Sequence, residues 1–336
     1  MGAISDAVNF GDWTRMRQWG MAVGVAMIGF ATLAYAGWID PAKSLYASNR
    51  WMWLSAASGG ALFGFGMVLS SGCGSKTLVR IGSGNLKSLV VFFVMGLAAF
   101  ATLKGITAVV RVATVDRVAV EMSGGTTLTD WAAALGGWSP AVAGMALAVL
   151  LGGTLIVWAL IGRDFRSPDN LLAGLGIGAV VVAMWAVSGK LGYVAEHPET
   201  LQEMFVATNS GRMEALTFTA PMAYTLDWLM LFSDKSKVLT IAIVSVVGVI
   251  VGATIQALAG RSFRWEGFRD VEDLANHMAG AVLMGVGGVT AMGCTVGQGL
   301  SGVSTLSATS FVAVAAIISG AMLGFRYQNW RVERMV

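Results

Sequence analysis

Residues 283–302 read LMGVGGVTAMGCTVGQGLSG, an apolar and glycine-rich stretch with one cysteine, Cys294. A related stretch, LFGFGMVLSSGCGSKTLVR, occupies residues 62–80 and contains Cys73. A shift of 221 positions (294 minus 73) aligns the two cysteines and also the pairs Gly59–Gly280, Gly64–Gly285, Gly66–Gly287 and Gly72–Gly293. Self-similarity at a fixed offset indicates an internal repeat. The chain has 2 cysteines, both at this position of the repeat, so a functional interpretation must explain them.

The composition places the chain in a membrane. Of its 336 residues 56% are hydrophobic and 12% are charged, whereas soluble domains carry about 25% charged residues. We therefore predict an all-α polytopic membrane protein whose surroundings are the lipid bilayer. The net charge of +3 fits basic cytoplasmic loops and does not indicate a nucleic-acid partner. Two cysteines so far apart are not a disulfide scaffold.

The uncharged runs predict the membrane spans. A span needs about 20 apolar residues. Around each cysteine, glycines interrupt the run, which favours a broken helix. We expect Cys73 at one break, followed by a short helix through Arg80. The sequence predicts about eight membrane spans. Charged residues within 104–140 and 218–232 leave it open whether each of these two segments adds a span. The predicted spans are residues 19–39, 51–75, 86–103, 141–161, 170–188 and 238–259, with two more passes within 274–325.

These runs also divide the chain into parts. The first span lacks a convincing small-residue cleavage site, so we expect it to be retained. The predicted parts are an N-terminal arm (1–18), a first repeat half with Cys73 (19–121), connecting spans with an acidic loop (122–237), a second repeat half with Cys294 (238–326) and a C-terminal tail (327–336).

Charged loops predict the orientation. Lys and Arg accumulate in cytoplasmic loops, and here basic residues lie within residues 80–87, 163–166 and 261–269 and near both ends of the chain. The acidic loop at 190–217 would lie outside, and both termini would be cytoplasmic, in a bacterial inner membrane. The Cys73 segment would run inward and the Cys294 segment outward. Two inverted repeats with broken helices that meet at a central pathway are a common transporter architecture.

The helix breaks predict an anion site. Backbone amides at the start of a helix attract anions, and we expect Gly74 and Thr295 to begin the half-helices. A thiol adds a soft group that can contact a sulfur atom. We predict that the two breaks hold a small reduced-sulfur anion, with no catalytic residue and no cofactor. The predicted substrate-binding residues are Cys73, Cys294, Gly72, Gly74, Lys76, Gly293, Thr295 and Gln298.

Other interpretations of these residues remain open. A buried cysteine often behaves as a small hydrophobe, and glycine-rich helices often serve close packing. Two thiols could instead form a redox or persulfide enzyme, or a soft-metal transporter that uses His277 or methionines; His277 by itself is better explained as a packed side chain. Asp227 is the only plausible intramembrane acid, so the sequence gives little support for proton coupling.

The two glycine–cysteine motifs resemble a known family. Gly64-x-Gly66…Gly72-Cys73 and the longer run from Met284 to Gly302 are similar to the paired signature of the YeeE/YedE sulfur-transport membrane proteins. The resemblance implies an inner-membrane importer of thiosulfate or a related species, two inverted helical halves, Cys73 and Cys294 at a central constriction, and a soluble cytoplasmic sulfurtransferase as partner. Thiosulfate-transporting members have a further cysteine in an N-terminal span. Residues 19–39 have none, which leaves a different sulfur or selenium species open.

Overall fold

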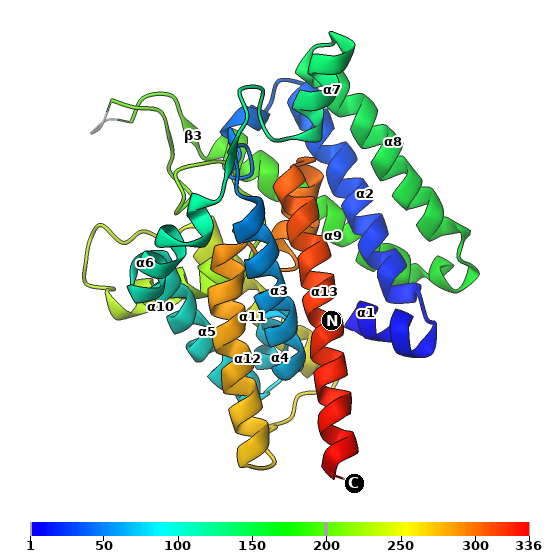
Figure 1. The fold of residues 1–336 in the computed structure, drawn as a ribbon, viewed down its shortest axis with the longest axis vertical. Coiled ribbons are helices and arrows are strands. Elements are labelled where there is room, and N and C mark those ends of the chain that lie inside the picture. The colour runs from blue at the N-terminus through cyan, green and yellow to red at the C-terminus, as the bar shows by residue number, and fades with distance from the viewer. Residues whose placement is uncertain (1, 198–200, 336) are drawn as a thin grey trace.

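The helices gather in two groups, with α13 (Ala308–Met335) between them in Figure 1. In one group α2 (Thr14–Tyr35) packs against α8 (Pro140–Ile161) and α9 (Pro168–Ala186). In the other, α3 (Trp53–Leu69) packs against α12 (Val271–Thr290) and α13, while α12 also packs against α5 (Leu86–Lys104). The structure is a computed structural model and describes residues 2–197 and 201–335.

Shorter elements connect these helices. Two pairs of short antiparallel strands join loops: β1 (Arg50–Trp51) pairs with β2 (Val120–Glu121), and β3 (Tyr193–Val194) pairs with β4 (Met204–Phe205). The shorter helices are α1 (Gly2–Ser5), α4 (Gly74–Gly82), α6 (Ile106–Ala113), α7 (Leu128–Gly136) and α10 (Thr219–Met230). One further long helix is α11 (Ile241–Ala259). The 3₁₀ and π-helical turns are η1 (Asp6–Phe10), η2 (Pro41–Lys43), η3 (Val115–Arg117), η4 (Arg163–Arg166), η5 (Val187–Leu191) and η6 (Gly297–Gly302).

Glycines allow α3 and α12 to cross in close contact. A Cβ atom on Gly59 would lie 2.7 Å from the carbonyl oxygen of Gly287, and one on Gly66 would lie 2.6 Å from that of Gly280. The partner number falls as the α3 number rises, so the two helices run antiparallel (Figure 1). Because the partner atoms are backbone, only a residue without a side chain permits this approach.

A second pair of contacts matches across the repeat. Gly64 of α3 faces Ile317 and Ala321 of α13. Its repeat equivalent, Gly285 of α12, faces Met95 and Ala99 of α5. Both pairs of partners differ by 222 positions (317 minus 95 and 321 minus 99), close to the 221 that relates the glycines. Helix α5 therefore packs on α12 as α13 packs on α3.

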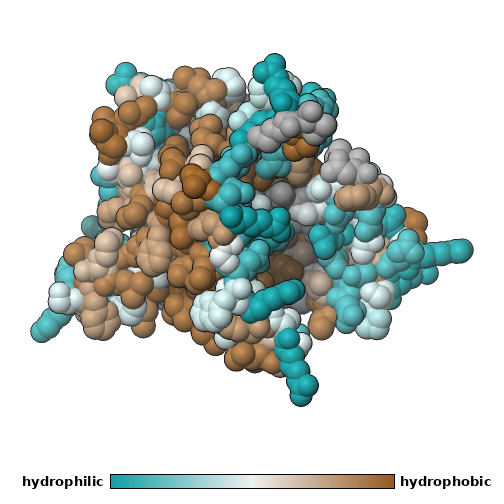
Figure 2. Space-filling model, turned by 90° about the horizontal axis from the view of Figure 1, so that it is seen from below, coloured by the Kyte–Doolittle hydropathy of each residue, from teal (hydrophilic) through white to brown (hydrophobic). Residues whose placement is uncertain are grey.

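The outer surface is that of a membrane protein. Within the described residues, seven helices are long and apolar enough to cross a membrane. Large apolar side chains on α8 and α11, among them Val149, Leu150, Val247, Val251 and Ile255, are exposed. Seen from the end where α13 finishes, hydrophilic side chains lie over the middle of the face, beside broad hydrophobic areas (Figure 2). The predicted all-α polytopic fold is therefore confirmed.

Helix ends differ from the predicted span ends. Helix α2 begins at Thr14, inside the predicted arm, and stops at Tyr35 rather than 39. Helix α13 continues to Met335, through the predicted tail. The two extensions arise because arginine limits the membrane-embedded part of a helix but is itself a good helix former, whereas α2 stops early at a turn in which Gly37 has a left-handed φ of 68°. Residues 104–140 form no full span, as expected, and the segment 218–232 contains only the 12-residue α10.

Candidate functional site

The same turn breaks the chain after α3 and after α12. Ser71 and Met292, which are repeat equivalents, both adopt left-handed backbone angles, with φ of 56° and 55°. Such angles are uncommon for residues other than glycine. The amide that follows each of them bonds back to the helix, Gly72 to the Met67 carbonyl at 2.9 Å and Gly293 to that of Gly288 at 2.8 Å. The repeat seen in the sequence is thus a repeat of backbone geometry.

A helical segment follows each cysteine. The carbonyl of Cys73 accepts the Thr77 amide at 2.9 Å, and that of Cys294 accepts the Gln298 amide at 2.8 Å. Gly74 begins α4, as predicted. In the second half, regular turns begin at Gly297 in the π-helical η6 rather than at Thr295. There the Cys294 sulfur itself accepts the Gly297 amide at 3.4 Å, as a capping side chain does at a helix start.

Both thiols lie in one buried cluster. Cys294 is fully buried, and Cys73, which is half-buried, packs against the same apolar cluster as Cys294. Thr295, the neighbour of Cys294, lies close enough for its side chain to interact with the Cys73 thiol. Ser75 Oγ lies 3.3 Å from Cys73 Sγ, and Thr217 Oγ1 lies 3.8 Å from Cys294 Sγ. The fold therefore brings together two cysteines that are 221 residues apart.

Thr77 and Gln298, which occupy equivalent positions, support the breaks. The Thr77 hydroxyl donates to the Cys73 carbonyl at 3.1 Å. The Gln298 amide nitrogen donates to the carbonyl of Ala291, where α12 ends, while its Oε1 atom is buried without a hydrogen-bond partner in the described structure. Gln298 is completely buried. Its side chain thus braces the turn that presents Cys294.

Glycines flank both cysteine turns, and Lys76 lies beside the Cys73 turn. A Cβ on Gly74 would lie 3.2 Å from the terminal methyl of Met95, and one on Gly293 would lie 3.1 Å from the Gln298 amide. The side chain of Lys76 is exposed and covers Gly72. From the N-terminal arm, Ile4 packs against the apolar cluster that holds the thiols. Lys76 therefore supplies positive charge beside Cys73.

A small cavity lies next to Cys294, in the second half of the repeat. It has a volume of about 150 Å³, and its lining includes Gly293, Thr217, Glu214, Arg111 and Tyr224. The sequence analysis did not select Glu214 or Arg111. The sequence does contain a pattern that could have indicated burial of Glu214, because it is the one charged residue in the run 213–218.

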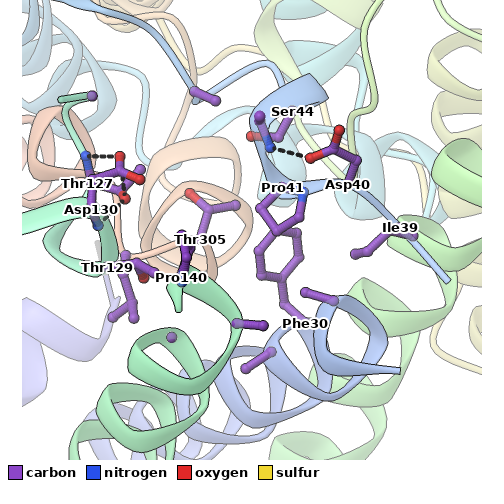
Figure 3. A pocket seen from close by; sticks show the side chains of 18 of the residues that line it. Phe30, Ile39, Asp40, Pro41, Ser44, Thr127, Thr129, Asp130, Pro140 and Thr305 are labelled. Atoms are coloured by element: carbon purple, nitrogen blue, oxygen red, sulfur yellow. Dashed lines mark hydrogen bonds between the residues drawn. The ribbon is translucent and has the colours of Figure 1, made fainter. Parts of the chain in front are cut away.

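A larger cavity of about 810 Å³ lies between α2, α7 and α8 (Figure 3). Its two acidic side chains hold local turns: Asp40 accepts the Ala42 amide at 3.0 Å, and Asp130 forms a capping box with Thr127. Thr305, just after η6, also reaches its wall. The thiols do not line this cavity.

Comparison with known proteins decides the family. A family model described as "Sulphur transport" matches residues 1–323. The chain belongs to this sulphur-transport family. A thiosulfate transporter, TsuA, of Escherichia coli (strain K12) is 27% identical over 312 residues, which cover 89% of this chain and 80% of that protein. TsuA of Spirochaeta thermophila is 28% identical over 272 residues, 78% and 74% of the two chains.

Family membership and the apolar helices identify a multi-pass membrane transporter rather than an enzyme. The expected resemblance to the YeeE/YedE proteins is confirmed. His277 is packed, with its ring against Phe268 and Nδ1 at 2.7 Å from the Asp273 carbonyl oxygen. Among the described residues, no three His, Cys, Asp or Glu side chains gather where they could hold a metal.

Proposed function

We propose that this chain imports thiosulfate, or a closely related small sulfur-containing anion, across the bacterial inner membrane by passing it between the thiols of Cys294 and Cys73. The observation that carries the proposal is the shared position of the thiols: both pack in one cluster, each at the start of a helical segment. The names of the two TsuA relatives support thiosulfate as the substrate.

We infer that the two halves are inverted repeats. Helices α3 and α12 run antiparallel, and the contacts of Gly64 and Gly285 match across the repeat. Helix α12 begins, and α13 ends, at the same end of the molecule (Figure 1). That end carries Lys87, Arg331 and the basic loop 261–269, so by the distribution of basic residues it faces the cytoplasm. Cys294 then faces the outer side and Cys73 the inner side.

The surroundings of the thiols suit weak, reversible binding of an anion. The Gly297 amide points at Cys294 Sγ, and the Lys76 amide at Cys73 Sγ. An anion that displaces or joins these contacts meets backbone N–H groups at helix starts and an S–H donor, which forms only weak hydrogen bonds. Transport requires sites weak enough to release what they bind. Thiols and backbone amides satisfy that requirement better than an ion pair with a buried cation would, and Lys76, the cation beside Cys73, is exposed.

The experiment measures uptake of ³⁵S-thiosulfate by bacteria that lack their own sulfate and thiosulfate importers. Cells that express the wild-type chain are compared with cells that express Cys73→Ala or Cys294→Ala. We expect uptake by the wild type and its loss in both variants. The matched control is Ser319→Ala, an exposed position on α13 whose hydroxyl bonds only within its own helix.

Unchanged uptake in Cys294→Ala, with normal amounts of protein in the membrane, would refute the two-thiol mechanism. If the wild type grows on another sulfur or selenium source but does not take up thiosulfate, the mechanism stands with a different substrate. A soluble sulfurtransferase that accepts the sulfur inside would be needed for growth, but not for initial uptake into proteoliposomes.

A further inference from the structure

The cavity beside Cys294 is lined by two residues that adjoin the thiol and by a buried acid. Thr217 lines the cavity and lies 3.8 Å from Cys294 Sγ through its hydroxyl, and Gly293, which precedes the cysteine, forms part of the wall. With a volume of about 150 Å³, the cavity has room for a small oxyanion. Glu214 also lines this cavity. Only 6% of Glu214 is exposed to solvent, so its carboxyl group is buried.

Glu214 has hydrogen-bond donors but no cationic partner in the described part of the chain. Ser210 Oγ donates to its Oε2 atom at 2.9 Å, and the Asn209 amide also bonds to the carboxyl group. The one cation that shares the cavity, Arg111, pairs instead with Asp116, with Nε 3.3 Å from Oδ2. A buried carboxylate without a cationic partner is costly to ionise.

The other titratable groups around Glu214 come from four segments of the chain. Tyr224 of α10 lies in the cavity wall. Tyr46, from the loop before β1, is close enough to interact electrostatically with both Glu214 and Cys294, and its hydroxyl donates to the Gly297 carbonyl at 2.7 Å. Arg111 of α6, with its partner Asp116, completes the set. None of these groups neutralises the Glu214 carboxylate directly.

The protonation of Glu214 therefore changes within the physiological range. Burial raises the pKa of Glu214 to about 7, although the hydrogen bonds from Ser210 and Asn209 lower it. Below that pH the side chain is neutral; above it, a negative charge faces the cavity. An anion in the same small cavity would repel this charge at short range, where little water screens it.

We propose that Glu214 is a proton-binding residue of the outer cavity, so that the anion reaches Cys294 only when Glu214 is protonated and one proton binds together with each anion. This proposal rests on the proposed sulfur-anion transport. It also supplies a reason for the acid. The interior of a bacterium is negative, which opposes import of an anion, and a proton that binds with the anion cancels part of the transferred charge.

The test measures the apparent KM for ³⁵S-thiosulfate in proteoliposomes at external pH values from 5.5 to 8.5. We expect KM to be constant below about pH 7 and to rise by about tenfold per pH unit above it, as one linked proton requires. Glu214→Gln, which resembles the protonated acid and keeps an acceptor for Ser210, should give a low KM at every pH. Glu203→Gln is the control, since that carboxylate lies in the same loop but is exposed and paired with Lys43.

A second variant tests the direction of the shift. Ser210→Ala removes a hydrogen bond that stabilises the ionised carboxylate, so the pH at which KM begins to rise should move upward. A loss of folding alone would not move this midpoint. Addition of thiosulfate to the wild-type protein in weakly buffered detergent at pH 7.5 should also make the solution more alkaline, because protons are taken up.

The outcomes separate the two proposals. A wild-type KM that does not change with pH, without proton uptake, would overturn the role of Glu214 while transport itself stands. The same holds if Glu214→Gln retains the wild-type pH dependence. Absence of thiosulfate uptake by the wild type at every pH would refute the proposed function, and the role of Glu214 with it.

Discussion

Replacing Gly66 by alanine would place a methyl group 2.6 Å from the carbonyl oxygen of Gly280, across the contact between α3 and α12. Its repeat equivalent, Gly287→Ala, would place one 2.6 Å from the carbonyl oxygen of Gly59. Because both partners are backbone atoms, no side chain can turn away. The helices must move apart by about 0.8 Å to reach an ordinary contact of 3.4 Å, and a gap of that size removes a quarter to a half of the local dispersion energy.

The magnitude follows from two opposing effects. Overpacking of this kind costs about 1–3 kcal/mol, whereas alanine gains up to about 1 kcal/mol over glycine in helix propensity. We expect both variants to lose about 1–2 kcal/mol, and to lose it equally, because the two contacts are equivalent. Gly153→Ala and Gly248→Ala are matched controls, since nothing lies within 4 Å of a Cβ at either position; these should be neutral or slightly stabilised.

Thermal unfolding in detergent, followed by the fluorescence of the 12 tryptophans, measures the difference. A loss of several degrees is expected for Gly66→Ala and for Gly287→Ala relative to the controls. If these two variants have the same melting temperature as the controls, the close antiparallel contact is wrong. If only one of them is destabilised, the equivalence of the two halves at this crossing is wrong.

Two further predictions concern a buried ion pair and the thiols. Lys87→Met removes the ammonium that lies 2.8 Å from Asp273, while His277 Nδ1 stays 3.0 Å from the same carboxylate, so we expect a loss of about 1–3 kcal/mol. The melting temperature should fall and partly recover in the double variant with Asp273→Asn, and no recovery would contradict the pairing. In single-cysteine proteins, Cys73 should react faster than Cys294 with a small thiol reagent, because Cys73 is half-buried and Cys294 fully buried. Mass spectrometry gives both rates, and we expect thiosulfate to slow both reactions because it would occupy the site beside the thiols. Equal rates, or rates that thiosulfate does not change, would contradict the described site.

The sequence was a good guide to the helix breaks because backbone conformation is set locally. Glycines and a cysteine recur at one offset, and the structure has the same left-handed turn at Ser71 and at Met292. Residues after the break were less predictable. Gly74 begins a helix as expected, whereas the second segment becomes regular only at Gly297, where the Cys294 sulfur accepts the amide. That difference depends on one side-chain contact.

Glu214 shows what a linear reading overlooks. In the sequence it belongs to an acidic loop, and its neighbours Glu196, Glu199 and Glu203 suggest exposure to solvent. In the structure, Met213, Glu214 and Ala215 are all buried, and the Glu214 carboxyl group faces a cavity formed with α6, α10 and the end of α12. Burial of an acid depends on which distant segments cover it, and hydropathy along the chain does not contain that information.

By itself the sequence determined the membrane class, the internal repeat and the two cysteines, because these depend on composition and on local backbone preferences. Tertiary structure alone decided that Thr295 meets the Cys73 thiol, that α3 and α12 cross antiparallel through their glycines, and that Glu214 shares a cavity with Arg111. These are contacts between residues far apart in the chain. They arise from packing energies summed over many helices, so no local pattern specifies them.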